Sequence, residues 1–313
     1  MKNYDKYIVA FSGGKDSTAC FLYLLSIGID VSKIELWHHL VDGQEETFMD
    51  WEVTEDYCRK FAEAFGVQIY FSWKEGGFER ELLRENARTA PMIFETPSGL
   101  VKAGGERGKL STRRKFPQVS GDLSVRWCSP YLKIQVCAAA IRNQDRFKGL
   151  KTVVLSGERG QESIQRSKYR ISERDEVHLD NKRVVHRWRP IRDWNENAVW
   201  AIIEKYNVVA HPCYYLGWTR CSCKFCIFGN ADQMASASKI SPIQSKKIIS
   251  YERAFATTIK RNESFSDLVE RGVPYQQITE SSAMKATSKI YSGAIFTNNW
   301  SIPAGAYGSG CGP

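Results

Sequence analysis

Short hydrophobic runs alternate with helical patterns along the first part of the chain. Residues 7–11, 34–38 and 67–71 are rich in β-branched and aromatic side chains, and each run has the length of a strand. Between them, residues 16–25 and about 47–65 carry hydrophobic side chains at helical spacing. Alternation of this kind predicts an α/β fold, with a mostly parallel sheet and helices on both of its faces.

The alternation weakens in the middle of the chain and then returns. Residues 91–122 are basic and contain Gly and Pro, so we expect an insertion there. After it the pattern predicts helices at about 130–143 and 195–206 and strands at 152–156 and 183–188. We therefore interpret residues 1–229 as one α/β domain.

The last third of the chain has a different character. Helical patterns at 242–260 and 264–271 predict a helical appendage over residues 230–299. Residues 300–313 are rich in Gly, Ser and Asn, and we expect them to form a flexible tail.

Composition limits the class of protein and suggests its ligands. Hydrophobic residues make up 42% of the 313 positions, which is enough for a real core. No apolar run approaches the roughly 20 residues that span a bilayer, and the N-terminus lacks a signal-peptide pattern, so we expect a cytoplasmic protein without a membrane partner. The net charge of +9 indicates either a solvated basic surface or affinity for nucleotides or nucleic acid. Basic residues are densest at 102–115.

The segment from Ser12 to Ser17 joins the first predicted strand to the first predicted helix, and it reads Ser-Gly-Gly-Lys-Asp-Ser. Two glycines permit a tight turn whose N–H groups converge on an anion, and the helix adds its positive N-terminal end. The serine hydroxyls and the Lys15 ammonium are further donors. The spacing is not that of a Walker A loop. The segment therefore predicts a phosphate site of another kind.

This segment resembles the PP-loop of N-type ATP pyrophosphatases and of phosphoadenylyl-sulfate reductases. The resemblance covers roughly residues 7–229 and implies a Rossmann-like, doubly wound fold of the adenine nucleotide α-hydrolase superfamily. It implies that the loop holds the pyrophosphate of ATP, or the phosphate or sulfate of a sulfonucleotide. Segments 41–47 and 157–166 resemble the parts that shape the adenosine pocket and close over the nucleotide, with a polar turn and a salt-bridged surface loop as the alternatives. The nucleotide-binding residues implied are Ser12, Gly13, Gly14, Lys15, Asp16, Ser17, Asp42, Gly157, Arg159 and Arg166, of which Lys15 and Asp16 are also catalytic candidates.

Nine cysteines in a protein expected to be intracellular do not suggest a disulfide framework. Cys223 and Cys226 have the Cys-x-x-Cys spacing of metal ligands. By resemblance to adenylyl-sulfate reductases and to the sulfur-inserting enzyme of DNA phosphorothioation systems, these two and Cys128 would bind a 4Fe–4S cluster. Those reductases have adjacent cysteines where this chain has Trp127 before Cys128, so the fourth ligand is open; we favour Cys221 over Cys213. Four thiolates also suit zinc, which stays as the alternative.

Three functions remain open at this point. The first is an ATP pyrophosphatase that adenylylates an acceptor with Mg²⁺, positioned by Asp16 or Asp42, before sulfur arrives from a donor such as a cysteine desulfurase. The basic residues 102–115 would suit a nucleic-acid acceptor. The second is a thiol-dependent sulfonucleotide reductase in which Cys311 is the catalytic nucleophile; only its Cys-Gly pair matches the reductase motif. The third is a nucleotide-binding or nucleic-acid-binding regulator without turnover.

Overall fold

The computed structural model describes residues 3–308, which form an α/β fold around one eight-stranded sheet. The strand order is β5-β4-β3-β2-β1-β6-β8-β7. The five central strands are parallel, and they are β3 (Gln68–Lys74), β2 (Ile34–Leu40), β1 (Lys6–Ala10), β6 (Lys151–Leu155) and β8 (Val184–Trp188). The edge strands pair antiparallel, and they are β4 (Met92–Thr96), β5 (Gly99–Ala103) and β7 (Ser172–Arg174). The mostly parallel sheet expected from the sequence is thus confirmed.

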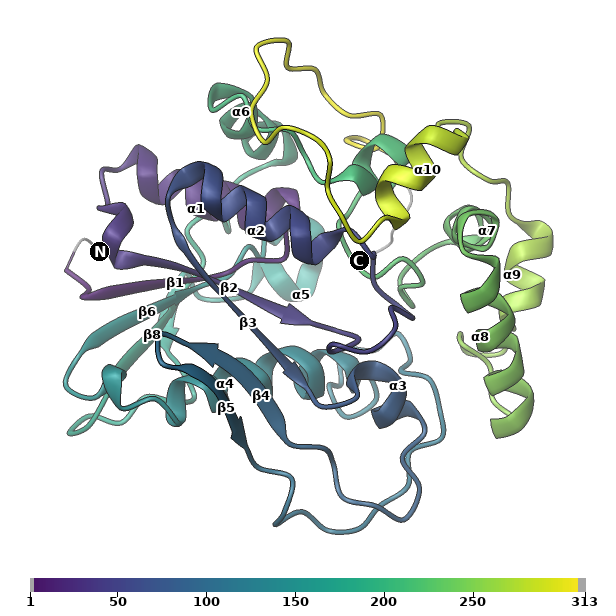
Figure 1. The fold of residues 1–313 in the computed structure, drawn as a ribbon, viewed down its shortest axis with the longest axis horizontal. Coiled ribbons are helices and arrows are strands. Elements are labelled where there is room, and N and C mark those ends of the chain that lie inside the picture. The colour runs from purple at the N-terminus through teal and green to yellow at the C-terminus, as the bar shows by residue number, and fades with distance from the viewer. Residues whose placement is uncertain (1–2, 309–313) are drawn as a thin grey trace.

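Helices cover both faces of the sheet (Figure 1). One face carries α1 (Lys15–Ser26), α2 (Thr54–Phe65) and α6 (Glu196–Lys205), and the other carries α4 (Gln135–Arg142). Successive side chains of a strand point to opposite faces. In β1, Tyr7 and Val9 therefore join the core under α1 and α2, whereas Ile8 joins the core under α4. Burial on both faces explains why this strand reads as a continuous hydrophobic run.

Two segments differ from the sequence expectation. The stretch 91–122, expected as an irregular insertion, begins with the β4–β5 hairpin that extends the sheet beyond β3. The helix expected over 47–65 begins only at Thr54, because the Asp42 carboxylate accepts three backbone hydrogen bonds that hold residues 48–50 as a loop. Both differences involve contacts with other parts of the chain, namely the pairing of β4 with β3 and the hydrogen bonds of Asp42, and hydrophobic periodicity does not predict such contacts.

The C-terminal helices lie on the side where the parallel strands end (Figure 1). They are α7 (Ala231–Ile240), α8 (Pro242–Phe255), α9 (Phe265–Arg271) and α10 (Glu280–Thr287), and the short α3 (Gly77–Leu82) and α5 (Ile164–Ser167) precede them in the chain. The larger hydrophobic cluster includes Tyr7 of the sheet as well as Met234, Leu268 and Ala286 of these helices. The helices and the sheet therefore share one core. None of the helices between residues 3 and 308 is long and apolar enough to cross a membrane.

The described part of the tail, residues 300–308, packs against the rest of the molecule. The Trp300 Nε1 group donates a hydrogen bond to the Val208 carbonyl at 2.8 Å. The Gly305 amide donates to the Tyr214 carbonyl at 2.8 Å, and Ala306 is buried. Residues 300–308 thus run back toward the loop that follows Tyr214.

Candidate nucleotide-binding site

The loop between β1 and α1, residues Ser12–Ser17, is called the phosphate loop after its expected ligand. It is closed by hydrogen bonds among its own residues. Gly13 has φ +76°, which favours glycine, and a Cβ there would lie 3.1 Å from Cys58 Sγ on α2. The Ser12 amide donates to Ser17 Oγ at 3.2 Å, and Ser17 Oγ donates to the Gly14 carbonyl at 2.9 Å. The Ser12 hydroxyl accepts the Gly14 amide at 3.4 Å, so the two hydroxyls expected to contact an anion also set the shape of the turn.

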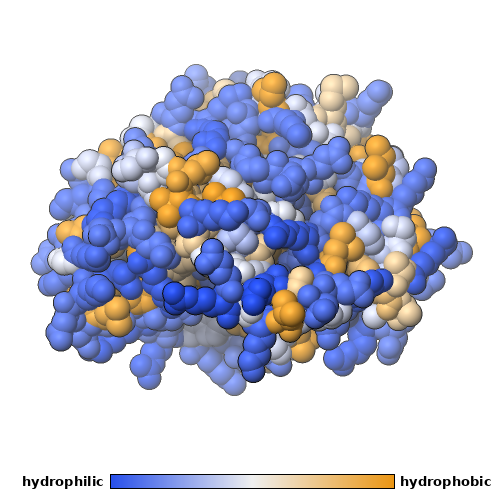
Figure 2. Space-filling model, turned by 60° about the horizontal axis from the view of Figure 1, so that its bottom comes forward, coloured by the Kyte–Doolittle hydropathy of each residue, from blue (hydrophilic) through white to orange (hydrophobic). Residues whose placement is uncertain are grey.

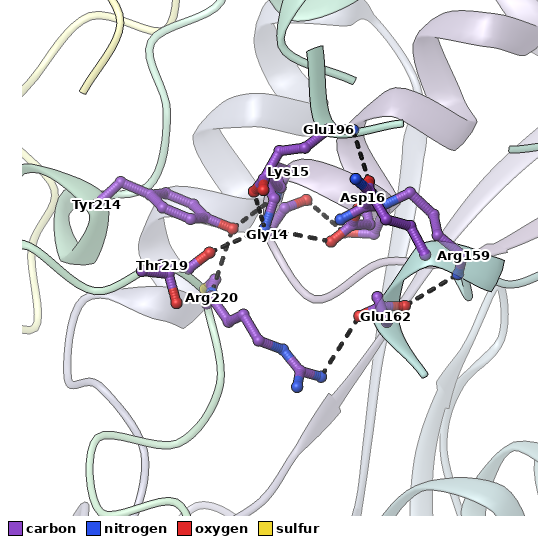
Figure 3. Close-up of polar contacts among 12 residues, drawn as sticks. Gly14, Lys15, Asp16, Arg159, Glu162, Glu196, Tyr214, Thr219 and Arg220 are labelled. Carbon is purple, nitrogen blue, oxygen red and sulfur yellow. Dashed lines mark hydrogen bonds and ion pairs between the residues drawn. The ribbon is translucent and has the colours of Figure 1, made fainter. Parts of the chain in front are cut away.

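The N-terminus of α1 is contacted by a segment about 200 residues away in sequence (Figure 3). The Lys15 amide donates to Tyr214 Oη at 2.9 Å, and the Cys221 amide donates to the same oxygen at 3.2 Å. The buried Lys15 Nζ donates to the Thr219 carbonyl at 2.8 Å and lies 3.2 Å from a carboxylate oxygen of Glu196. Protein oxygen atoms thus contact the donors at the positive end of the helix, and the oxygens of a phosphate would contact the same donors.

The loop after β6 is pressed against the same helix. Arg159 Nε donates to Asp16 Oδ1 at 2.6 Å, and the arginine is buried. A Cβ on Gly157 would lie only 2.8 Å from the Asp16 carbonyl carbon, so this approach requires glycine. Glu162 accepts the Arg159 amide at 2.9 Å and pairs with Arg166. The structure therefore brings the predicted loop 157–166 to the phosphate loop, with one arginine turned inward and the other bound to Glu162.

A cavity of about 160 Å³ opens beside Ser12. Its walls come from the ends of β1, β2 and β6 and from α4, and they include Ala10, Trp37 and Val154. Ligands of open α/β sheets bind outside the carboxyl ends of the strands, where this cavity lies. An apolar pocket next to a turn of backbone amides can hold a flat base while the amides face its phosphates.

Two histidines of β2 line this cavity and are neutral at physiological pH. Burial lowers the pKa of His38 to about 4, although its bond to the Phe11 carbonyl opposes the change. Burial also lowers the pKa of His39 to about 3, with the neighbouring His38 acting in the same direction. Neither ring therefore brings positive charge to the cavity.

Asp42 stabilises a loop from inside the protein. Its Oδ2 atom accepts the amides of residues 48–50 at 2.8 to 3.0 Å, whereas its buried Oδ1 has no hydrogen-bond partner among the described residues. Burial raises the pKa of Asp42 to about 7, although the Asp50 amide opposes this change. Asp42 thus shapes the wall of the site through backbone contacts.

The four cysteines expected to share one metal site lie in two neighbourhoods. Cys226 raises the pKa of both Cys128 and Cys223, although burial is the largest cause of each shift. Among the described residues, however, these three thiols do not form a set of ligand atoms within 4.8 Å of one another. Cys221 belongs to another set with His211 and Cys213. Whether a metal or a cluster binds the first three cysteines stays a prediction.

The thiol of Cys221 touches the phosphate loop. Its Sγ lies 3.7 Å from the Ser12 carbonyl oxygen. A hydrogen bond with the Cys213 side chain lowers the pKa of Cys221, and His211 acts in the same direction while burial opposes both. The sequence favoured Cys221 over Cys213 as the fourth cluster ligand, but the side chains of these two residues are in contact.

The catalytic candidate Cys311 lies outside the described residues. The last described residue, Gly308, lies against Thr219, since a Cβ there would be 2.9 Å from Thr219 Cγ2. Thr219 in turn supplies the carbonyl that binds Lys15. The described chain therefore ends next to the phosphate loop.

The basic segment 102–115 is partly neutralised within the protein. Arg113 lies 2.8 Å from the buried Glu81 and stacks over Trp127, and Arg114 pairs with Glu85 at 2.6 Å. Figure 2 shows a mainly hydrophilic face on which hydrophobic residues gather only in small groups. Nucleic-acid binding by this segment stays a prediction.

Sequence reasoning missed Tyr214, Thr219 and Glu196, which contact the first turn of α1. Each lies more than 180 residues from Lys15, and none belongs to a motif. Only the return of the chain to the first helix could reveal them.

Comparisons with known proteins identify the family of the chain. The model of the phosphoadenosine phosphosulfate reductase domain family matches residues 6–228. A protein of Escherichia phage 186, described as an uncharacterized 37.8 kDa protein in the gpa 5′ region, is 24% identical over 276 residues, covering 82% of this chain and 77% of that protein. An adenosine 5′-phosphosulfate reductase of Burkholderia cepacia is 28% identical over 72 residues, covering 23% of this chain and 27% of the reductase.

Among solved structures, Candida glabrata FMN adenylyltransferase in complex with ATP matches with a TM-score of 0.39 and 12% identity. The match covers 72% of this chain and 53% of the adenylyltransferase, so this chain matches about half the length of that enzyme. Its TM-score is too low to support an argument about function. The family model, by contrast, covers most of the chain and includes the phosphate loop, the loop after β6 and the Cys-x-x-Cys pair. The chain therefore belongs to the phosphoadenosine phosphosulfate reductase domain family.

Proposed function

We propose that the protein cleaves ATP between its α- and β-phosphates and transfers the adenylyl group to an acceptor that then receives sulfur. The observation that supports this proposal is the junction at Ser12, where the N-terminus of α1 meets the cavity beside β1, β2 and β6. Adenosine in the cavity would direct its phosphates to the loop between β1 and α1. Membership of an adenine-nucleotide family agrees with this placement.

The reaction we propose is an in-line displacement at the α-phosphorus. An oxygen of the acceptor attacks that phosphorus, the bond to the bridging oxygen breaks, and pyrophosphate leaves with the electron pair. Its charge would be stabilised by the amides at the start of α1 and by Lys15. For this, Lys15 Nζ would exchange the Thr219 carbonyl for a phosphate oxygen when ATP binds, and the Lys15 amide would leave the Tyr214 hydroxyl.

Mg²⁺ would enter the site with ATP and neutralise charge on the phosphates. Each carboxylate expected to position it already has one oxygen engaged, and the other oxygen of Asp42 is buried. Asp16 accepts a hydrogen bond from Arg159, and Asp42 accepts the amides of residues 48–50. We therefore propose that the phosphates of ATP and water, rather than protein carboxylates, would supply most of the ligands of the ion.

Delivery of sulfur would follow the adenylylation: the terminal persulfide sulfur of a cysteine desulfurase, the class of donor, would displace AMP from a nucleic acid, the class of acceptor. A second thiol would then cleave the S–S bond to the desulfurase. The exposed basic residues of 102–115 support the acceptor assignment through their attraction to phosphates. In this proposal Cys128, Cys223 and Cys226 would hold a 4Fe–4S cluster, a group that transfers electrons and binds sulfur. Under this proposal the protein would be nearest in character to the DNA phosphorothioation branch.

The test incubates anaerobically purified protein with ATP, Mg²⁺ and either DNA or transfer RNA, and measures pyrophosphate. Ser17→Ala removes the hydroxyl that closes the phosphate loop, and Ser26→Ala removes an exposed hydroxyl at the other end of α1 as the matched control. We expect pyrophosphate release by the wild type and Ser26→Ala, and a loss of tenfold or more in Ser17→Ala. Tight ATP binding without pyrophosphate release from any acceptor would instead support a regulator without turnover.

A second function, reduction of a sulfonucleotide to sulfite, is favoured by the position of the tail. The Gly305 amide donates to the Tyr214 carbonyl, and Gly308 lies against Thr219, so residues 305–308 are held beside the segment that contacts Lys15. The Cys311 thiolate would attack the substrate sulfur, form a thiosulfonate and release the nucleotide; a thiol of reduced thioredoxin would then release sulfite. Sulfite formation from adenylyl or phosphoadenylyl sulfate that disappears in Cys311→Ser would establish this reaction. Unchanged activity in Cys311→Ser would exclude that role for Cys311.

A further inference from the structure

Three ligand-bearing side chains meet behind the phosphate loop, apart from the Cys128, Cys223 and Cys226 set. His211 stands at the N-terminus of the short 3-10 helix Pro212–Leu216, Cys213 lies within that helix, and Cys221 follows the next turn. One ligand atom from each of these three side chains lies within 4.8 Å of the other two. His211 and Cys213 are fully buried, and Cys221 is partly exposed.

The donor set suits a soft divalent cation. Zinc takes thiolate and imidazole ligands in a tetrahedron, with bonds of about 2.3 Å to sulfur and about 2.0–2.1 Å to nitrogen. These bonds imply spacings of about 3.4–3.8 Å between ligand atoms. The three ligand atoms lie within 4.8 Å of one another, so they are close enough for one ion to bind all three after small side-chain movements.

The surroundings fit the same interpretation. Two thiolates offset the charge of a divalent ion, so the complex is neutral and can lie in a buried place. The His211 Nε2 atom lies 3.2 Å from Thr54 Oγ1, and the Cys213 amide donates to Nδ1 at 3.2 Å. Coordination through Nδ1 would replace this amide contact and leave the Nε2 proton for Thr54, the type of outer partner that orients metal-binding histidines.

We propose that His211, Cys213 and Cys221 form a zinc site that fixes the wall of the nucleotide site. Cys221 Sγ lies 3.7 Å from the Ser12 carbonyl, and the Cys221 amide shares Tyr214 Oη with the Lys15 amide. An ion at this place would tie the loop after Tyr214 to the 3-10 helix. A zinc-bound thiolate has no proton for the Ser12 carbonyl, so the connection to the phosphate loop would run through the amides of Cys221 and Lys15 on Tyr214 Oη. Three protein ligands leave a fourth coordination position for water or another ligand. The proposal does not depend on which reaction the protein catalyses.

The test measures the zinc and iron content of the anaerobically purified full-length protein by inductively coupled plasma mass spectrometry. Cys213→Ser removes a ligand of the proposed site, and Cys128→Ser, which alters only the other cysteine set, is the matched control. We expect about one zinc per wild-type chain, the same amount in Cys128→Ser and less than a tenth of it in Cys213→Ser. Zinc lost from Cys128→Ser but kept by Cys213→Ser would overturn the proposal.

A second measurement keeps the test valid if Cys213→Ser does not fold. A chelator removes the metal from the wild-type protein under reducing conditions, and circular dichroism shows that the protein is still folded. The protein is then titrated with Co²⁺, because the absorption of bound Co²⁺ reports the number of thiolate ligands. Saturation at one Co²⁺ per chain, with a tetrahedral spectrum of two thiolates, supports the site. A spectrum of three or four thiolates, no binding, or a Cys213–Cys221 disulfide that persists under the same reducing conditions would refute it.

Discussion

The close approach of the loop after β6 to the first turn of α1 makes Gly157→Ala the most direct test of the site. The added Cβ would lie 2.8 Å from the carbonyl carbon of Asp16 and 2.9 Å from its carbonyl oxygen. Both are backbone atoms of a helix and cannot rotate away. Gly157 does not have a positive φ, so the substitution adds a steric conflict without backbone strain of its own.

The expected effect follows from the size of this conflict. Ordinary contact needs about 0.5 Å more space, and overpacking of this kind costs about 1–3 kcal/mol of folding free energy. The displaced loop also carries Arg159, whose Nε lies 2.6 Å from Asp16 Oδ1. Arg159 is also an expected contact of the ATP phosphates, and loss of one such contact of a charged group, about 1.5–3 kcal/mol, corresponds to a rise of about 10- to 150-fold in the Kd for ATP.

Two assays measure these effects. Urea unfolding followed by tryptophan fluorescence gives the free energy of unfolding, and isothermal titration calorimetry gives the Kd for ATP. Gly121→Ala is the matched control, because a Cβ at Gly121 meets no described atom within 4 Å and Gly121 has no positive φ. If Gly157→Ala unfolds and binds ATP as Gly121→Ala does, the two loops do not meet as described, and the reasoning fails.

Three further predictions concern the surroundings of this site. Because burial raises the pKa of Asp42 to about 7, the folded protein keeps a proton on Asp42 between about pH 4 and 7, where the unfolded chain has lost it. The free energy of unfolding of Asp42→Asn should therefore rise relative to that of wild type by up to about 3 kcal/mol between pH 5 and 7.5. A pH-independent difference in urea unfolding would contradict this. Arg159→Gln leaves the partly exposed Asp16 carboxylate without its shortest ion pair and should cost about 1–3 kcal/mol in the same assay, whereas Asp16→Asn in the Arg159→Gln background should restore part of that loss. Gly305→Ala places a Cβ 2.2 Å from the Trp218 carbonyl oxygen, so the tail should detach and become sensitive to brief proteolysis, and resistance equal to that of wild type would show that the tail does not pack there.

The sequence determined the class of the fold and its phosphate loop because both depend on neighbours along the chain. The alternation of hydrophobic runs and helical patterns was sufficient for the parallel sheet. The Ser-Gly-Gly-Lys-Asp-Ser segment could be located between a strand and a helix, since Gly13 must take the positive φ that the turn needs. Resemblance to a family then extended this local pattern to the loop at residues 157–166.

The tertiary structure decided which distant residues complete the site. Tyr214 and Thr219 reach Lys15 only because the chain returns to the first helix after about 200 residues, and no periodic pattern encodes that return. The cysteines give the clearest case: their spacing grouped Cys221 with its sequence neighbours, but the fold turns its thiol toward Cys213 and His211. Spacing along a chain limits how far apart two side chains can lie, whereas the direction in which each side chain points is fixed by packing.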